Sequence, residues 1–235
     1  MATNTFTGDD DLIVNSAARL PVCLCLDCSG SMNKNDAIDQ LNKGVGAFYE
    51  AIKNNEQAKI SCEIAVVTFN GEVTVVDDFG LVETKQVPQF TAEGGTAMAH
   101  AVEKCLSLLE ERKADYKRNG VEYFQPWLVL ITDGKPGDKE DMPAVTEKTR
   151  QLIEDKKLTL FPIAVGSDDD EVKFREIMDV LNSFTPKPKA LHLRNLKFQE
   201  FFEWLGKSVV DLSQSTVGEK IKLDTSTILD DWGEI

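Results

Sequence analysis

One stretch of the sequence organises the rest of the chain, and it reads Leu24–Cys25–Leu26–Asp27–Cys28–Ser29–Gly30–Ser31–Met32. The apolar residues before Asp27 predict a buried strand that ends at this aspartate. Asp27, Ser29 and Ser31 alternate along the chain, so their side chains can face the same way. Carboxylate and hydroxyl oxygens at the end of a strand favour a hard divalent cation such as Mg²⁺, Mn²⁺ or Ca²⁺ over zinc or copper. Serine and glycine are also ordinary turn residues, so this stretch alone leaves both interpretations open.

Two later stretches add oxygen donors of the same kind. Gly94–Gly95–Thr96 opens a predicted helix and offers a hydroxyl, and Ile131–Thr132–Asp133–Gly134 ends a second apolar run with an aspartate. In open parallel sheets, ligands bind beyond the carboxyl ends of the strands, which is where Asp27 and Asp133 are expected. The alternative is local: Ser29, Ser31 and Thr96 would cap helices, and the aspartates would accept from nearby backbone amides.

Strand and helix patterns alternate along the whole chain. Strands are predicted over residues 19–27, 60–69, 127–133, 158–165 and 190–193, and helices over residues 38–52, 97–116, 142–156, 174–181 and 198–212. Asn70–Gly71 predicts a hairpin turn, so residues 72–79 would pair antiparallel with the preceding strand at the edge of the sheet. Gly166–Ser167–Asp168 would cap the following helix. This alternation predicts an α/β fold: a doubly wound, mostly parallel central sheet with one antiparallel edge strand and helices on both faces.

Length and composition predict one domain with short appendages. The chain has 235 residues, of which 42% are hydrophobic, enough for a packed core. We expect a flexible lead over residues 1–18, the α/β domain over residues 19–213, and an acidic tail over residues 214–235. In the tail, acidic residues beside Trp232 would dock on a neighbouring molecule, Trp232 would fold back on its own domain, or the end would be disordered.

Charge and cysteine content restrict the partners and the compartment. Forty acidic residues against 26 basic ones give a net charge of −14, which argues against nucleic acid because phosphate binding needs a basic surface. No apolar run reaches the roughly 18–20 residues of a membrane span, and residues 1–18 lack the plan of a signal peptide. Five cysteines, three of them in strand patterns (Cys23, Cys25 and Cys62), indicate buried free thiols in a reducing compartment. A soft-metal cluster at Cys23–x–Cys25–x–x–Cys28 lacks a second Cys or His pair nearby. We therefore expect a cytoplasmic protein with no membrane partner.

The oxygen donors, taken in order, resemble the metal-ion-dependent adhesion site of von Willebrand factor A domains. Asp27, Ser29, Ser31, Thr96 and Asp133 match that motif position by position. The resemblance implies a Rossmann-like fold and a non-enzymatic protein-binding module. It implies that hydroxyls bind the cation directly, that the aspartates bind partly through water, and that an Asp or Glu of a protein partner completes the shell. Mg²⁺ is the expected ion, with Mn²⁺ and Ca²⁺ as alternatives.

Further segments are similar to the TerY-type group, intracellular bacterial proteins of this family associated with tellurite resistance. They are Arg19–Leu20–Pro21–Val22, the run from Ile131 to Asp138, and Phe201–Phe202–Glu203–Trp204–Leu205. Cys28 departs from the group, in which Thr is usual. Asp138 also recurs in the family pattern, and we place it at the rim, where its charge would favour a helix amino terminus. This similarity implies a cytoplasmic stress-response system with kinase or phosphatase partners, and it leaves the oligomeric state open.

An enzyme is the alternative function. A Mg²⁺-dependent haloacid-dehalogenase-like phosphatase would use Asp27 as nucleophile and Asp133 near the metal. Its usual general acid stands two residues after the nucleophile, where this chain has Ser29, and a serine does not act as a carboxylic acid near neutral pH. Neither His100 nor His192 adjoins a convincing nucleophile, and no phosphate-loop or dinucleotide glycine pattern occurs. We therefore expect no enzymatic activity.

Overall fold

The computed structural model describes residues 15, 17–139, 141–166, 171–185, 190–194, 197–219 and 223. Its strands are β1 (Leu20–Asp27), β2 (Cys62–Phe69), β3 (Val73–Asp77), β4 (Trp127–Thr132), β5 (Thr159–Gly166) and β6 (Leu191–Arg194). Its α-helices are α2 (Ala37–Lys53), α3 (Glu56–Ser61), α4 (Met98–Asn119), α5 (Met142–Glu154), α6 (Glu171–Ser183) and α7 (Phe198–Ser213). Two 3₁₀ helices, η1 (Gly30–Asp36) and η2 (Val82–Thr84), lie in loops.

The strands form one six-stranded sheet in the order β3-β2-β1-β4-β5-β6. Every neighbouring pair is parallel except β2 and β3, which are antiparallel across the Asn70–Gly71 turn. Every residue of β1 and β4 is buried, as their continuous apolar runs predict for central parallel strands. The chain leaves β1 toward β2 and later returns to β4 on the other side, so a crevice forms beyond the carboxyl ends of β1 and β4. The predicted fold class is confirmed.

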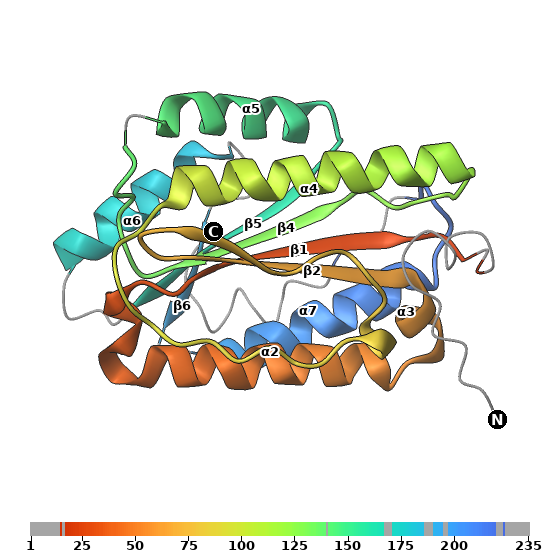
Figure 1. Ribbon diagram of the computed structural model, residues 1–235, viewed down its shortest axis with the longest axis horizontal. Helices are drawn as coiled ribbons and strands as arrows, with labels where there is room; N and C mark the ends of the chain where they lie inside the picture. The colour runs from red at the N-terminus through yellow and green to blue at the C-terminus, as the bar shows by residue number, and fades with distance from the viewer. Residues whose placement is uncertain are drawn as a thin grey trace.

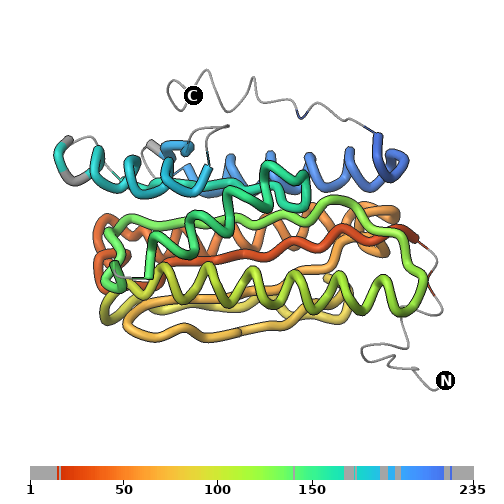
Figure 2. The backbone as a smooth tube through the Cα atoms, turned by 90° about the horizontal axis from the view of Figure 1, so that it is seen from above, coloured from red at the N-terminus to blue at the C-terminus, as the bar shows by residue number. Residues whose placement is uncertain are grey.

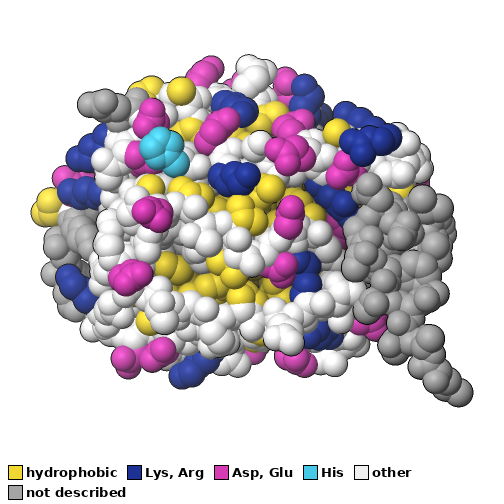
Figure 3. All heavy atoms as spheres, viewed as in Figure 1, with side chains coloured by type: hydrophobic (Ala, Val, Ile, Leu, Met, Phe, Trp, Pro, Cys, Tyr) yellow, Lys and Arg dark blue, Asp and Glu magenta, His cyan; other side chains and the backbone are white. Residues whose placement is uncertain are grey.

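Helices cover both faces of the sheet (Figures 1 and 2). On one face α2 and α7 pack against alternate side chains of β1, from Leu20 to Leu26, in a single apolar cluster. On the other face α4, α5 and α6 enclose a second cluster that includes Cys23 and Cys25. Each helix therefore buries one stripe and leaves its other side to solvent, and acidic and basic side chains are interspersed on the face that Figure 3 shows.

Two glycines allow α2 and α7 to approach closely. A Cβ atom added at Gly44 would lie 2.6 Å from Cδ2 of Phe202, and one at Gly206 would lie 2.7 Å from Cβ of Ala51. Real Cβ atoms do not come this close to their neighbours, so a larger residue at either position would push the two helices apart.

A buried ionic network joins β1, β2 and α4 at the amino-terminal edge of the sheet. Glu63 is fully buried, and its Oε1 lies 3.2 Å from Nε of Arg19. Arg112 donates to both carboxylate oxygens, at 2.6 and 2.9 Å, and the Tyr116 hydroxyl donates to Oε2 at 2.6 Å. Two guanidinium groups and one phenol thus compensate a single carboxylate that is out of reach of water.

The region before β2 differs from the prediction. The sequence predicted one strand over residues 60–69, whereas α3 ends at Ser61 and β2 begins at Cys62. The Asn55 side chain caps α3 by accepting from the backbone amides of Gln57 and Ala58 at 3.1 and 2.9 Å. The sequence did not predict this short helix, because the apolar alternation that indicates the strand already begins at Ile60, in the last turn of α3.

The limits of α4 also differ. The helix begins at Met98 instead of Thr96 or Ala97, and it continues to Asn119 before Gly120 ends it with a φ of +66°. The helix therefore extends three residues beyond the predicted end at residue 116, and Lys113 is one of its buried residues.

The expected division of the chain stays a prediction. β1 begins at Leu20 and α7 ends at Ser213, but most of the lead and the tail, including Trp232, lies outside the described residues, as do Ser167 and Asp168. Within the described ranges, no helix combines the length and apolar character that a bilayer crossing requires. All five cysteines are free and buried, which agrees with structural thiols.

Candidate metal centre

Three loops meet in the crevice beyond β1 and β4, and main-chain hydrogen bonds hold them together. The amide of Gly30 donates to the carbonyl of Gly94 at 3.1 Å, and the amide of Glu93 donates to the carbonyl of Cys28 at 2.8 Å. The amide of Gly137 donates to the carbonyl of Thr96 at 2.6 Å. The loop after β1 and the loop after β4 are thus each tied to the loop that precedes α4.

The structure brings all five predicted donor residues together in this crevice. The Ser31 hydroxyl donates to Oδ1 of Asp133 at 2.6 Å, and the hydroxyl oxygens of Ser29 and Ser31 are 3.0 Å apart. The other two donor residues, Thr96 and Asp27, both lie beside Gly134. A Cβ added at Gly134 would lie 3.4 Å from Oγ1 of Thr96 and 3.6 Å from Oδ2 of Asp27. Side chains that are 102 residues apart in sequence are therefore in direct contact.

Thr132 is a further member of the site that the sequence analysis did not identify. Its hydroxyl donates to Oδ2 of Asp27 at 2.5 Å and accepts from the amide of Gly134 at 3.1 Å. The amide of Ser29 donates to the other oxygen of Asp27 at 2.7 Å. Both carboxylate oxygens of Asp27 are thereby fixed in place. The signal was present in the sequence, since Thr132 stands directly before Asp133 at the end of an apolar run.

The donors differ in depth. Asp27 is fully buried, Ser29 and Asp133 are buried, and Ser31 and Thr96 are half-buried. Burial raises the pKa of Asp27 to about 6, against the hydrogen bonds from Thr132 and Ser29, which lower it, and with a smaller contribution from the charge of Asp133, which raises it. The charged carboxylate lies at the floor of the crevice and the neutral hydroxyls of Ser31 and Thr96 lie nearer the solvent.

Helix capping does not explain these hydroxyls. Ser29 precedes η1 but its side chain makes no capping hydrogen bond, and the cap residue of α4 is Ala97, not Thr96. The other half of the local alternative is partly right, because Asp27 does accept from the amide of Ser29.

Asp138 lies beside the first turn of α4, and its place at the rim of the donor set stays a prediction. Its Oδ2 accepts from the backbone amide of His100 in the first turn of α4 at 2.9 Å, which is a favourable place for a carboxylate. The His100 ring is largely exposed and lies within 3.4 Å of Asp138 and 3.1 Å of Asp141. The second histidine, His192, is buried with its ring centroid 3.7 Å from that of Phe174.

The donor set fits a hard divalent cation. Two carboxylates and three hydroxyls supply oxygen ligands alone. Among the described residues no lysine or arginine forms an ion pair with Asp27, so its buried charge is compensated there by hydrogen bonds from Thr132 and Ser29 and by no cationic side chain. No group of three or more His, Cys, Asp or Glu in the described part of the chain is placed to hold a metal ion, so the described cysteines form no soft-metal cluster.

Solved structures with the same fold include surface proteins of bacteria. The pilus adhesin SpaC from Lactobacillus rhamnosus GG, in its open conformation, matches with a TM-score of 0.64 and 15% identity over 83% of this chain and 30% of SpaC. The vWF domain of the type V pili tip protein Mfa5 from Porphyromonas gingivalis matches with a TM-score of 0.61 and 11% identity over 87% of this chain and 99% of that domain. At these identities the likeness shows the fold alone.

Two comparisons of sequence agree with that fold. The calcium-activated chloride channel regulator 3A-1 of Mus musculus is 29% identical over 126 residues, which are 50% of this chain but 12% of the regulator's length. The family model of the von Willebrand factor type A domain matches residues 22–201. Such domains are generally metal-dependent adhesion or protein-interaction modules and are typically non-enzymatic. Because the match covers well over half of its length, the chain belongs to the von Willebrand factor type A domain family.

Proposed function

We propose that the chain is a non-enzymatic protein-binding module whose residues Asp27, Ser29, Ser31, Thr96 and Asp133 hold a divalent cation. Mg²⁺ is the expected ion, and Mn²⁺ and Ca²⁺ are the alternatives. The observation that carries this proposal is the contact between Ser31 and Asp133, at 2.6 Å, beside the fixed carboxylate of Asp27. Oxygen donors from three separate loops converge where an open parallel sheet places its ligands.

The residues have different parts in this function. Thr132 and the amide of Ser29 orient Asp27, so its carboxylate is positioned before any ligand arrives. Ser31 and Thr96 are half-buried and bring neutral hydroxyls to the mouth of the crevice. When bound, a divalent cation would offer a coordination position there to an Asp or Glu of a protein partner. Removing one member of such a charged pair in an interface typically costs about 2–5 kcal/mol of binding free energy.

The partner belongs, in this proposal, to a cytoplasmic bacterial stress system like that of the TerY-type group, with a kinase or phosphatase as candidate. The support is the similarity of three segments, Arg19 to Val22, Ile131 to Asp138 and Phe201 to Leu205. Only the second of them contains a proposed donor, Asp133. Phe201 and Leu205 are buried between α7 and the sheet, so the last of these segments supports the grouping through the core and not through the site.

The test is calorimetric titration of Mg²⁺ and Mn²⁺ into the full chain and into the Asp27→Ala variant. We expect binding that is lost in Asp27→Ala. Asp138→Asn is the matched control, because this proposal places Asp138 outside the donor set and the amide oxygen of the variant can still accept from the His100 backbone amide; the affinity of this variant should stay within about twofold. Equal affinity of the wild type and Asp27→Ala would refute the metal centre. A pull-down from cell extract that is sensitive to both EDTA and Asp27→Ala then tests recruitment of a partner.

The phosphatase alternative is not supported. The general acid of such a phosphatase would stand at position 29, where this chain has a serine. Ser29 has no carboxyl group, and its hydroxyl oxygen lies 3.0 Å from that of Ser31. Turnover of an activated phosphate ester by the full chain with Mg²⁺, abolished in Asp27→Asn, is the result that would revive this alternative.

A further inference from the structure

A pocket of about 710 Å³ lies at the opposite edge of the sheet from the metal centre. Gln125 and Pro126, which directly precede β4, form part of its lining, and the rest comes mainly from α4, the end of α5 and the turn after α7. Five of the lining side chains are lysines, against one acidic residue: Lys113, Lys117, Lys148, Lys156, Lys157 and Glu110. We refer to it as the lysine pocket. It concentrates positive charge on a chain whose net charge is −14.

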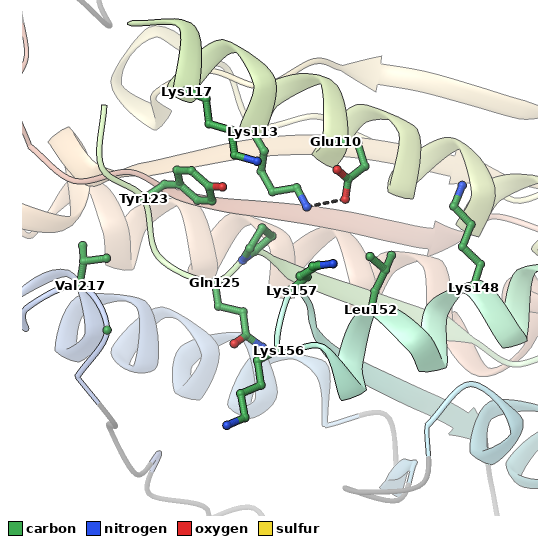
Figure 4. Close-up of a pocket in the computed structure, with 12 residues that line it drawn as sticks. Glu110, Lys113, Lys117, Tyr123, Gln125, Lys148, Leu152, Lys156, Lys157 and Val217 are labelled. Carbon is green, nitrogen blue, oxygen red and sulfur yellow. Dashed lines mark hydrogen bonds and ion pairs between the residues drawn. The ribbon is translucent and has the colours of Figure 1, made fainter. Parts of the chain in front are cut away.

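Three of the five lysines have an acidic neighbour. Lys113 pairs with Glu110 within α4, as the dashed line in Figure 4 marks. Nζ of Lys148 lies 2.7 Å from Oε1 of Glu103, and Nζ of Lys157 lies 2.9 Å from Oδ2 of Asp155.

The other two lysines, Lys117 and Lys156, form no ion pair within the described part of the chain. Both are exposed to solvent; Figure 4 shows Lys117 extending beside Lys113 and Lys156 at the outer edge of the pocket, directed away from α4. They are the lysines whose charge is left to attract an anion.

The turn after α5 carries two of the lysines, and Figure 4 shows Lys157 extending toward α4 and Lys156 extending away from it. Lys156 has a φ of +57°, in the left-handed region that favours glycine. Its amide donates to the carbonyl of Ile153 at 3.0 Å, and the amide of Lys157 donates to the carbonyl of Leu152 at 2.8 Å. This pattern closes the helix in the way glycine usually does. A lysine at this position costs about 1–2 kcal/mol and presents its side chain from a fixed turn.

Apolar surface completes the lining. Tyr123 lies with its ring centroid 5.3 Å from that of Tyr116, and Leu152 and Val217 line the same space. Figure 4 shows Lys113 and Lys117 extending from α4 and Leu152 and Lys157 rising from α5 and the turn that follows it. A volume of this size is typical of pockets for small molecules, and the net charge of −14 of the whole chain disfavours an extended nucleic acid.

We propose that the lysine pocket binds a small molecule that carries two or three phosphate groups. Each phosphate carries up to two negative charges, and lysine ammonium groups bind phosphate as point charges. Phosphate groups concentrate that charge in a small volume, whereas a peptide carries one carboxylate per acidic residue and spreads the same charge along an extended chain. The Tyr123 side of the pocket accommodates a non-phosphate part, such as the ring system of a nucleotide.

The experiment uses the full chain in EDTA, which separates this pocket from the metal centre. Inorganic tripolyphosphate and ADP are titrated calorimetrically at low ionic strength into the wild type and into Lys117→Gln/Lys156→Gln. We expect the double variant to lose at least tenfold in affinity. The control is Lys43→Gln/Lys207→Gln, which removes the same charge from exposed positions of α2 and α7, on the other face of the sheet.

Each outcome decides the proposal. Tighter binding of ADP assigns the pocket to nucleotides, and tighter binding of tripolyphosphate assigns it to polyphosphates; both support it. Absence of binding by both probes overturns it, as does an equal loss in the control variant. Competition by a short polyglutamate peptide at similar affinity overturns the assignment to phosphate.

Discussion

The buried carboxylate of Asp27 makes the stability of the metal-free protein depend on pH in an unusual direction. Its pKa rises from 3.8 to about 6 on folding, chiefly because of burial. Below pH 4 the residue is protonated in both the folded and the unfolded states. Between pH 4 and 6 the unfolded chain releases this proton and the folded chain retains it. Stability therefore falls as pH rises through this window.

The expected loss is about 3 kcal/mol, because each pH unit between the two pKa values is worth about 1.4 kcal/mol. Asp27→Asn removes the titration but keeps the shape, and its amide can still accept from the Ser29 amide and bond to Thr132. Urea denaturation in EDTA, at intervals from pH 4 to 7.5, gives the unfolding free energy of both proteins. Their difference cancels the other carboxylates, so the wild type should lose about 2.5 kcal/mol relative to Asp27→Asn from pH 4 to 7.5, because part of the loss of about 3 kcal/mol falls below pH 4.

Mn²⁺ provides the second arm of the same experiment. Binding of a cation requires the ionised carboxylate, so affinity should fall below pH 6 by up to about tenfold per pH unit. At pH 7, Mn²⁺ at about 100 times its Kd should return about 2.7 kcal/mol to the wild type and nothing to Asp27→Asn. Parallel pH profiles of the two proteins in EDTA would refute the reasoning, because Asp27 would then titrate alike in the folded and unfolded states.

Three further predictions concern stability, each measured by urea denaturation. Glu63→Gln should lower the unfolding free energy by about 3–5 kcal/mol, because Arg19 and Arg112 would lose the carboxylate that compensates them in the buried network. The control, the exposed Glu72→Gln, should change it by less than about 0.5 kcal/mol, and equal effects of the two substitutions would contradict this explanation. Gly44→Ala should lower the unfolding free energy by about 1–3 kcal/mol by overpacking against Phe202. In the control Gly46→Ala, in the same helix, the added Cβ meets no atom within 4 Å, so this variant should gain about 0.5–1 kcal/mol. A gain in both variants would show that the contact between α2 and α7 adapts freely. Asn55→Ala should cost about 1 kcal/mol by removing the cap of α3, with Asn55→Asp as the control that retains the acceptor, and an unchanged unfolding midpoint in Asn55→Ala would indicate that tertiary packing alone holds this helix.

The sequence predicted those parts of the fold that depend on local patterns. The apolar runs of β1 and β4 indicated central strands, because both faces of such a strand are buried. Asp27 is the last residue of β1 and Asp133 directly follows β4, so each run ends at an aspartate. Asn70–Gly71 identified the antiparallel pair through turn chemistry. The five donors could be named because their order and residue types are themselves the pattern.

Contacts between distant segments left little trace in the sequence. Glu63 stands in a strand pattern, and nothing local indicates that Arg19 and Arg112 compensate its charge. The six residues of α3 are too few to show a helical period. The lysine pocket arises where α4 ends beside the turn after α5, so its charges assemble only once the chain has folded.

The main-chain bonds among the three loops of the proposed metal centre have a consequence for which residues of the site can be substituted. Gly30, Glu93 and Gly137 hold the loops through backbone amides, which every residue except proline supplies. These bonds do not depend on the donor side chains, but the loops still need small residues, because a Cβ at Gly137 would lie 3.3 Å from the carbonyl oxygen of Thr96. A donor could therefore be replaced by another residue of similar size while the main-chain bonds that hold the three loops together stay in place.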